Sequence, residues 1–330
     1  MIVRKSLSPS FLKPVIEFES QLVQLDKLLS TFINVSPNIT SQMDDLRLSL
    51  ICLKQDLFLS LTPLQKLHFV RQPDRPTTLD YIGYMMDDWI ELHGDRGGTD
   101  DLAIVGGIGS LNSMTVVFIG HQRGKDTKDN VVRNFGMASP GGYRKALRLM
   151  KHANRFNFPI LTFVDTPGAW AGIEAEKLGQ GEAIAVNLKE MFSFEVPIIC
   201  TIIGEGGSGG ALGIGVGNKV LMLQHAVYTV ATPEACAAIL WKDSTKSLVA
   251  AESLKITSLD LKALGIIDDI VQEPLCGSQS NPFEAAQNLR SKLIDELRLL
   301  LQLTGEERKK MRYSKFRQVG KFYELSQVSM

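Results

Sequence analysis

The chain has 330 residues, of which 44% are hydrophobic and 22% are charged, a composition typical of a globular protein. Lys and Arg together number 36, as do Asp and Glu, so the formal net charge is zero. This balance argues against a protein that binds nucleic acid or a membrane surface through bulk charge. No apolar run approaches the ~18 residues that a membrane-spanning helix requires.

The N-terminal region is predicted to be helical. Apolar residues recur at three- and four-residue steps from about residue 14 to 32 and again from 43 to 57, with a Ser36-Pro37-Asn38 break between them. This spacing is typical of an amphipathic helical hairpin, which usually serves in packing or at a subunit interface. The first residues lack the apolar core of a signal peptide and are too short for an obvious transit peptide.

The segment that follows the helical region contains two prolines between Gln72 and Thr77 and is interpreted as a linker. Thr77 then offers an N-cap, with Asp80 three residues further on. These signals predict a helix from Leu79 to Leu92, closed by Gly94.

From Leu102 onward, short apolar runs alternate with helical patterns. The predicted strands are 103–108, 115–119, 160–164, 198–203, 220–223, 227–230 and 266–271, and the predicted helices are 143–156, 181–194, 233–241 and 247–254. This order predicts an α/β fold, and its spacing suits a superhelix of β-β-α units better than one half of a Rossmann fold. From Asn281 the chain is again helical and ends in a basic run, expected to be solvated, from Arg308 to Lys321.

The four cysteines (Cys52, Cys200, Cys236 and Cys276) are scattered along the chain and form no C-x-x-C pair. The sequence therefore predicts small buried residues in a reducing compartment, and neither a disulfide framework nor a zinc ribbon.

The most informative stretch runs from Ile198 to Gly217. An apolar, β-branched run predicts a strand buried on both faces, and it leads into Gly204-Glu205-Gly206-Gly207-Ser208-Gly209-Gly210 and a helix start. Glycine permits unusual backbone angles and leaves the backbone open to a ligand. The first N–H groups of a helix have no internal partner. Such a turn suits a bound anion or an oxyanion that forms during a reaction.

Other motifs overlap at the same glycines. The dinucleotide fingerprint G-x-G-x-x-G needs an acid at the end of the next strand, where Gln224 and His225 stand. The hydrolase motif G-x-S-x-G needs an acid between Ser208 and a later histidine, and none precedes His225. No Lys-Ser or Lys-Thr follows, as a P-loop requires. Two interpretations remain: an oxyanion hole of backbone N–H groups, or a glycine turn that only permits close packing.

A second turn of small residues follows the predicted strand 160–164, in the run Asp165-Thr166-Pro167-Gly168-Ala169. If the two strands are neighbours, the N–H groups of Gly168 and Ala169 can face those of Gly206 and Gly207. Two sets of backbone donors across one cleft can stabilise two oxyanions, or one oxyanion and one carbonyl. An ordinary surface turn is the alternative.

The strands 103–108 and 115–119 are predicted to form a hairpin around Leu111-Asn112-Ser113, and cations gather between this hairpin and the helix 143–156. A phosphate-binding surface is one interpretation of Arg123, Lys125, Arg133, Arg144 and Lys145, and a solvated charged loop is the other. His121 is a candidate acid or base, although a lone histidine after a strand is more often structural. No two residues form a convincing nucleophile and base, which points to an enzyme that brings an activated reagent to an enolisable thioester.

Several long motifs resemble the carboxyltransferase alpha-subunit family of multisubunit acetyl-CoA carboxylase, over roughly residues 14 to 325. They are the runs 120–124 (Gly-His-Gln-Arg-Gly), 133–137 (Arg-Asn-Phe-Gly-Met), 142–150 (Gly-Tyr-Arg-Lys-Ala-Leu-Arg-Leu-Met), 165–169 (Asp-Thr-Pro-Gly-Ala) and 204–212 (Gly-Glu-Gly-Gly-Ser-Gly-Gly-Ala-Leu). The sequence Ala169-Trp170-Ala171-Gly172 is similar to that of the cyanobacterial and algal-plastid branch of this family.

The resemblance implies a crotonase-like fold of β-β-α turns, with an N-terminal helical extension at 1–76, a carboxyltransferase core at 77–280 and a C-terminal helical extension at 281–330. It implies transfer of a carboxyl group from carboxybiotin, on a biotin carboxyl carrier protein, to acetyl-CoA, which gives malonyl-CoA for fatty-acid synthesis. The amides of Gly206 and Gly207 would stabilise the charge on the biotin carbonyl. From the turn and charge patterns described above, Gly168, Ala169 and the five cations are predicted to bind substrate.

The family further implies an active site shared with a beta subunit, in an assembly of two alpha and two beta chains served by biotin carboxylase. Zinc is expected only in the beta subunit, and no cofactor is expected to be bound covalently to this chain. Plastid stroma is the expected location, with bacterial cytoplasm as the alternative. Rival hypotheses are a crotonase-like acyl-CoA hydratase or decarboxylase that acts alone, and a structural partner without catalysis.

Overall fold

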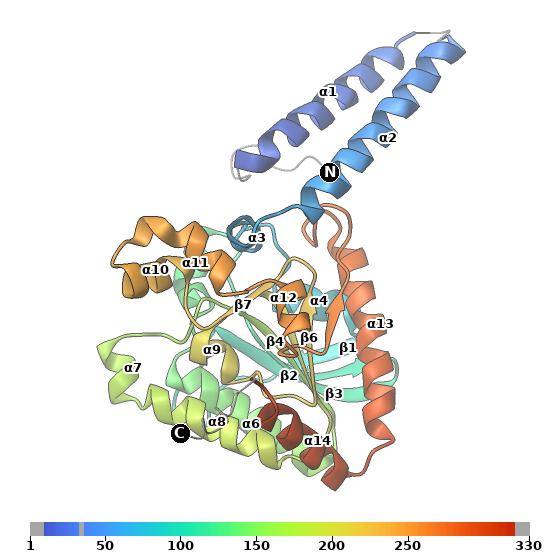
Figure 1. The fold of residues 1–330 in the computed structure, drawn as a ribbon. Coiled ribbons are helices and arrows are strands. Elements are labelled where there is room, and N and C mark those ends of the chain that lie inside the picture. The colour runs from blue at the N-terminus through green and yellow to red at the C-terminus, as the bar shows by residue number, and fades with distance from the viewer. Residues whose placement is uncertain (1–9, 33–35, 321–330) are drawn as a thin grey trace, which may run out of the picture.

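The computed structural model describes residues 10–32 and 36–320, and its centre is a mixed β-sheet (Figure 1). The eight strands follow the order β1-β2-β3-β4-β5-β6-β8, and β7 pairs with β5. Their bounds are β1 (Asp88–Glu91), β2 (Ile104–Leu111), β3 (Met114–His121), β4 (Ile160–Thr166), β5 (Ile198–Gly207), β6 (Lys219–Leu223), β7 (Val227–Thr229) and β8 (Asp269–Val271).

The helices cover the sheet and extend beyond it. Their bounds are α1 (Lys13–Leu29), α2 (Pro37–Leu59), α3 (Pro63–Val70), α4 (Thr78–Met85), α5 (Thr127–Val132), α6 (Pro140–Phe156), α7 (Ile173–Lys177), α8 (Gln180–Ser193), α9 (Ser208–Leu212), α10 (Pro233–Trp241), α11 (Ser247–Ser253), α12 (Ser258–Ala263), α13 (Pro282–Leu301) and α14 (Gly305–Arg317), with short 3₁₀ turns η1 (Ser10–Leu12), η2 (Asn134–Gly136) and η3 (Ser244–Lys246). Helices α6 and α8 pack together, and α13 packs against α4 and β5.

The strands from β3 to β8 are parallel, whereas β1, β2 and β3 form an antiparallel meander. Parallel neighbours need a crossover, and α6 and α8 supply it on either side of β4 in the chain. The carboxyl ends of β3, β4 and β5 therefore meet at one edge of the sheet. Ligands of open α/β sheets bind at such an edge.

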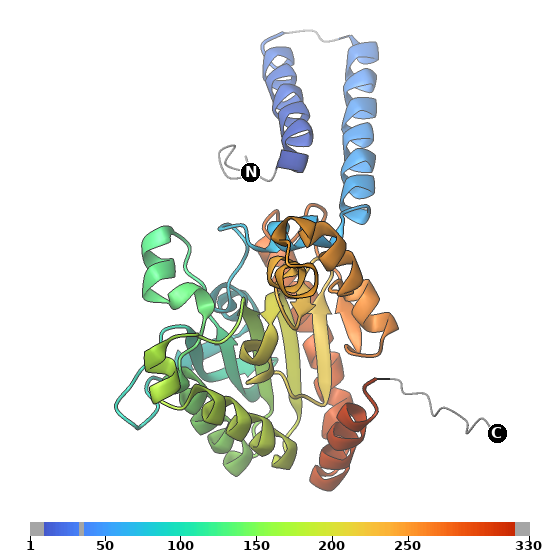
Figure 2. The same cartoon turned by 60° about the vertical axis from the view of Figure 1, so that its left-hand side comes forward.

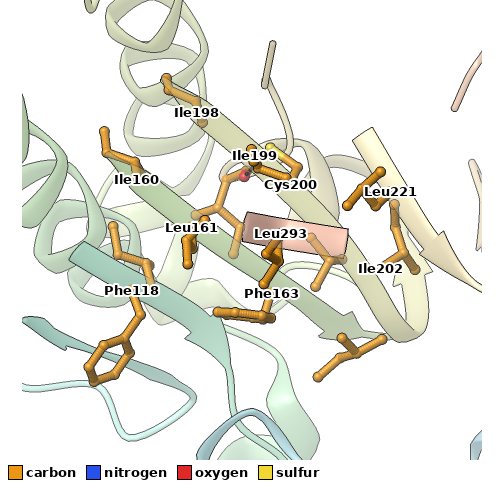
Figure 3. Packing of buried hydrophobic residues seen from close by; sticks show 14 of the residues in the cluster. Phe118, Ile160, Leu161, Phe163, Ile198, Ile199, Cys200, Ile202, Leu221 and Leu293 are labelled. Atoms are coloured by element: carbon orange, nitrogen blue, oxygen red, sulfur yellow. Dashed lines mark hydrogen bonds between the residues drawn. The ribbon is translucent and has the colours of Figure 1, made fainter. Parts of the chain in front are cut away.

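The core is centred on β4 and β5, which are buried at every position. Figure 3 shows Ile160, Phe163, Ile199 and Cys200 on these strands, with Leu293 of α13 over them. Burial on both faces explains why these strands are continuous apolar runs without polar alternation. The sequence predicted both strands, and the structure confirms them.

The helical hairpin predicted at the N-terminus is also confirmed. Helices α1 and α2 lie antiparallel and project from the body of the molecule in both ribbon views (Figure 1 and Figure 2). Between them Val15, Leu22, Met43 and Leu50 form a small apolar cluster. The tight turn predicted after Leu111 is present too: β2 and β3 are joined at Asn112 and Ser113, which have positive φ angles of 52° and 62°.

The helix predicted from Leu79 to Leu92 is wrong beyond Met85. The capping box of Thr77 and Asp80 is present and starts α4, but the chain then enters β1. Strand β1 pairs with β2, and the ring of Trp89 lies 5.8 Å from that of Phe118. Pairing with the sheet therefore overrides the local helical pattern, as tertiary context often does.

Three smaller interpretations also need correction. The second half of the segment interpreted as a linker is packed inside the protein: Arg75, Pro76 and Thr77 are buried, whereas Pro73 and Asp74 are exposed. The last strand begins at Asp269 and not at Ile266. Of the cysteines, Cys200 is buried, Cys52 is exposed and the other two are partly exposed. The short helices α3, α5 and α12 were not predicted.

The basic C-terminal run is not uniformly solvated. Arg312 is fully buried and donates to the carbonyl oxygens of Phe194 at 2.9 Å and Val196 at 3.2 Å. It also donates to Asn218 Oδ1 at 2.7 Å. One arginine thus ties α14 to the start of β5. Lys321, the last member of the run, lies outside the described residues.

Candidate active site

Two small-residue turns lie side by side at the carboxyl edge of the sheet. Strand β4 leads into Pro167–Ala169. The glycine turn, Gly206–Gly210, comprises the last two residues of β5 and the first three of α9. The two strands are parallel neighbours, and Thr166 of β4 is paired with Gly206 of β5. The sequence predicted that these turns would meet if the two strands were neighbours, and the structure confirms that the strands are neighbours.

The glycines are required for the two turns to approach so closely. A Cβ atom added at Gly207 would lie 2.1 Å from the carbonyl oxygen of Pro167. One added at Gly210 would lie 2.4 Å from the amide nitrogen of Ala169. Both neighbours are backbone atoms that cannot rotate away. The close packing of the two turns therefore depends on these two glycines.

Helix α9 begins at Ser208, immediately after Gly207, and within the described chain no side chain caps it. Its first N–H groups have no intrahelical acceptor, as at any helix start. Ser208 is exposed and has a positive φ of 48°, a strained angle for a residue with a side chain. Strain of this kind is found at functional turns, and here it places a helix start beside Pro167–Ala169.

The serine of this turn has no triad partner in His225. That imidazole packs against the rings of Phe58 and Phe69, with centroids 5.5 and 5.7 Å away. Burial lowers the pKa of His225 to about 4, so the ring is neutral. The structure therefore agrees with the exclusion of a hydrolase.

The acids at the strand ends are occupied by arginines. Arg71 donates to both oxygens of Glu205, at 2.6 and 2.9 Å, and Arg123 donates to Glu205 Oε2 at 2.9 Å. Arg123 Nε also lies 3.1 Å from Asp165 Oδ1. Burial opposes ionisation of Glu205, but the bonds from Arg71 and the charge of Arg123 outweigh it and lower the pKa. Glu205 is therefore a fixed anion and not a free acid.

The cationic candidates are mostly engaged in ion pairs. Arg133 pairs with Asp129 at 2.9 Å and Arg144 with Asp95 at 3.0 Å. Lys125 pairs with Asp80 at 2.5 Å, but its side chain is 65% exposed, so solvent reaches it freely. Acids therefore largely neutralise these three cations, which come from the loop after β3, the end of α5 and helix α6.

Lys145 requires a correction among the candidates. Its side chain is fully buried and pairs with Asp100. Its ammonium also donates to the carbonyl oxygen of Asp101 at 3.0 Å. A ligand cannot reach this ammonium without displacing the core, so the geometry gives Lys145 a role in packing α6 against the segment before β2.

His121 is not placed for acid–base chemistry. It is completely buried at the end of β3, and burial, with the charge of Arg123 added, lowers the pKa of the ring to about 3. A neutral, enclosed imidazole cannot exchange protons with a substrate near pH 7. The structural interpretation of this lone histidine is the correct one.

Sequence reasoning missed Arg71, Arg75 and Tyr228. Arg71 binds Glu205, Arg75 binds the backbone of β5, and the ring of Tyr228 covers Gly206, where an added Cβ would lie 2.7 Å from it. These contacts join residues that are distant in the sequence, so no local pattern predicts them.

No group of three or more His, Cys, Asp and Glu side chains in residues 10–32 and 36–320 is arranged to hold a metal ion. The same ranges contain no helix that is both long enough and apolar enough to cross a membrane.

Residues 9–320 match the family model described as acetyl co-enzyme A carboxylase carboxyltransferase-like. The acetyl-coenzyme A carboxylase carboxyl transferase subunit alpha of the red alga Antithamnion sp. is 72% identical over 324 residues, 98% of this chain and 100% of that protein. The protein of the same name from the cyanobacterium Synechococcus elongatus is 57% identical, over 98% of each chain.

Solved structures support the fold. A Pseudomonas malonate decarboxylase hetero-tetramer in complex with coenzyme A matches with a TM-score of 0.57 and 17% identity, over 71% of this chain and 91% of that one. Transcarboxylase 12S matches with a TM-score of 0.52 and 20% identity, over 63% and 40%. At such identities the likeness concerns the fold alone, and it confirms the predicted crotonase-like α/β architecture.

Proposed function

This chain belongs to the acetyl-CoA carboxylase carboxyltransferase-like family, and we propose that it acts as the alpha subunit, which transfers a carboxyl group from carboxybiotin to acetyl-CoA and so forms malonyl-CoA. The observation that carries this proposal is the meeting of two glycine-containing turns at the carboxyl edge of β4 and β5. The product supplies fatty-acid synthesis.

The reaction needs stabilisation of negative charge more than it needs a side-chain nucleophile. When the carboxyl group leaves carboxybiotin, negative charge develops on the carbonyl oxygen of biotin. N–H groups fixed in advance stabilise such charge without reorganising. We assign Gly206 and Gly207 as these donors, and Gly168 and Ala169 as the facing wall that binds substrate. Arg123 pairs with Asp165 and Glu205, the acids that precede the two turns.

Carboxybiotin fits this site because the glycine turn presents main-chain atoms in place of side chains. At Gly207 and Gly210 side chains would collide with Pro167–Ala169, so both turns present main-chain atoms. Biotin, carried by a separate carrier protein, supplies the activated carboxyl group. The residues of this chain bind and orient it and hold the developing charge. Lys125, the most exposed of the five cations, is the one best placed to meet a phosphate of coenzyme A.

Multisubunit carboxylases divide this work among chains, and a beta subunit completes the site in our proposal. Exposed apolar residues on and beside α10 support a partner surface: Val230 is 72% exposed, Ile239 is 75% exposed and Leu240 is 64% exposed. The proposed assembly contains two alpha and two beta chains, with zinc in beta, and works with the biotin carboxyl carrier protein and biotin carboxylase. Red algal and cyanobacterial relatives support plastid stroma or bacterial cytoplasm as its location.

The test measures carboxyl transfer in reverse, from malonyl-CoA to free biocytin. The chain is assayed alone, with a matched beta subunit, and with that subunit after Gly206→Val. We expect activity only with both chains and a loss of about 10²–10³ in kcat in the variant. Because valine would also displace the Tyr228 ring, Tyr228→Leu is the matched control and should retain most activity.

Each rival function has a distinct outcome in this assay. Activity of the chain alone on an acyl-CoA would support a hydratase or decarboxylase. Full activity of the Gly206→Val variant with the beta subunit would refute the assignment of Gly206 and Gly207 as N–H donors and favour a structural subunit. The arginine-bound states of Asp165 and Glu205 already argue against a hydratase, which needs a free acid in its cleft.

A further inference from the structure

A β-bulge lies in β5 directly before the glycine turn. Between two paired positions, β4 advances two residues (164 to 166) while β5 advances four (202 to 206). Residues 203–205 of β5 therefore lie opposite Asp165 alone. Bulges between parallel strands are rare, and bulges in general are enriched beside active sites, where they redirect the chain.

The bulge interrupts pairing on the other side of β5 as well. Strand β6 pairs with β5 as far as Ile202, and β7 begins to pair at Glu205. In the described structure, Ile203 and Gly204 thus have no paired residue in a neighbouring strand. Their backbone groups are buried and must find other partners, because an unpaired buried polar group is costly.

Two buried side chains each bind one backbone group of this stretch. Arg75 donates to the carbonyl oxygen of Ile203 from Nε at 2.9 Å and from Nη2 at 2.7 Å. Asp165 Oδ1 accepts the N–H of Glu205 at 3.0 Å. A Cβ at Gly204 would lie 2.3 Å from the same Oδ1, so only glycine lets this carboxylate reach the backbone. We call Arg75 and Asp165 the bulge clamp.

Both members of the bulge clamp are themselves held. Arg75 forms two bonds of 3.0 Å to the oxygens of Glu273, which also accepts the N–H of Ser278 at 2.8 Å. Asp165 lies 3.1 Å from Arg123. Arg75 is 5% exposed and Asp165 is 4% exposed, so neither side chain is available to a ligand. Their geometry is fixed before any substrate arrives.

The bulge decides where the glycine turn lies along β4. A strand rises about 3.3 Å per residue. The two extra residues therefore place the glycine turn about 6.5 Å less far along β4 than a regular strand would. Without them Gly204 would face Thr166, and the glycine turn would extend beyond Pro167–Ala169. With them Gly207 lies against Pro167, so the two turns meet.

We propose that Arg75 and Asp165 are positioning residues for carboxyl transfer: by clamping the bulge they fix the N–H groups of Gly206 and Gly207 against the turn Pro167–Ala169. This inference rests on the proposed function of those N–H groups. It adds two residues that do not contact the reacting atoms. A displacement of about 1 Å at a reacting centre can lower the rate about 10²-fold.

The test compares Arg75→Lys, Asp165→Ala and Asp165→Asn in the alpha–beta complex, with transfer from malonyl-CoA to biocytin as the assay. Lysine keeps the charge beside Glu273 but cannot make both bonds to Ile203. We expect kcat to fall about 10- to 100-fold in Arg75→Lys and Asp165→Ala, with KM for malonyl-CoA within about twofold. Asparagine keeps an acceptor for the Glu205 N–H, so its kcat should exceed that of Asp165→Ala.

Arg312→Lys is the matched control, because Arg312 is also a buried arginine that binds backbone carbonyls, but far from this edge. It should lower the melting temperature and leave kcat unchanged. If Arg75→Lys behaves in the same way, or if Asp165→Asn is no better than Asp165→Ala, the clamp is structural only and the inference is wrong. A Gly207→Ala variant assayed in parallel separates the two proposals. Full activity of that variant would refute the assignment of the Gly206 and Gly207 N–H groups as donors.

Discussion

Substitution of Gly207 by alanine tests the close approach of the two turns most directly. The new Cβ would lie 2.1 Å from the Pro167 carbonyl oxygen and 2.3 Å from its carbon. Real Cβ contacts are essentially never shorter than 3.0 Å, so the turns must separate by at least about 0.9 Å (3.0 minus 2.1). Overpacking of this kind destabilises a fold by about 1–3 kcal/mol.

The effect on catalysis should be larger than the effect on stability. A shift of about 1 Å in the donors is expected to lower kcat about 10²-fold or more. Gly209→Ala is the control in the same turn, because its Cβ would meet only Ile184 Cδ1, at an ordinary 3.8 Å. Alanine inside α9 should stabilise the protein by up to about 1 kcal/mol and leave kcat within about twofold.

Both variants are to be assayed with the beta subunit for biocytin carboxylation, and unfolded with denaturant to measure stability. The reasoning is refuted if Gly207→Ala transfers carboxyl groups at the wild-type rate. It is also refuted if Gly209→Ala loses activity as severely as Gly207→Ala, because the glycine turn would then tolerate no methyl group anywhere and the collision with Pro167 would explain nothing.

Three further predictions concern buried polar groups. Burial holds the pKa of His121 at about 3, below its ordinary 6.5, so the unfolded chain binds a proton more readily and stability is lost as the pH falls below about 6.5. By pH 5 this loss is about 2 kcal/mol. Denaturant unfolding at pH 7 and at pH 5 measures it, and His121→Gln should remove this loss from the difference between the two free energies. Arg312→Leu leaves several buried carbonyl oxygens without a donor and should lower the free energy of unfolding by at least about 3 kcal/mol, while Lys310→Leu on the exposed side of α14 should change it little. Lys145→Met should lower stability by about 1–3 kcal/mol without altering KM for malonyl-CoA, and a large rise in KM would restore this lysine as a substrate ligand.

Local patterns in the sequence determined much of the fold. The continuous apolar runs of β4 and β5, the helical stripes of α1 and α2, and the turn at Asn112 and Ser113 each depend on residues close together in the chain. The glycine turn was recognisable for the same reason, since its backbone freedom is a property of the glycines themselves. Its role as a donor of N–H groups remains a proposal.

Tertiary structure alone decided what surrounds that turn. Arg71 and Glu205 are 134 residues apart, and Arg75 and Glu273 are 198 apart, so no local pattern could pair them. The bulge in β5 exists only relative to the register of β4, and the change from helix to strand at β1 depends on pairing with β2. Hydrophobic periodicity reports which face of an element is buried, but it carries no information about which distant charge or strand will lie against it. For this reason the sequence by itself located the two turns of the candidate site, whereas the contacts that hold them together required the folded chain.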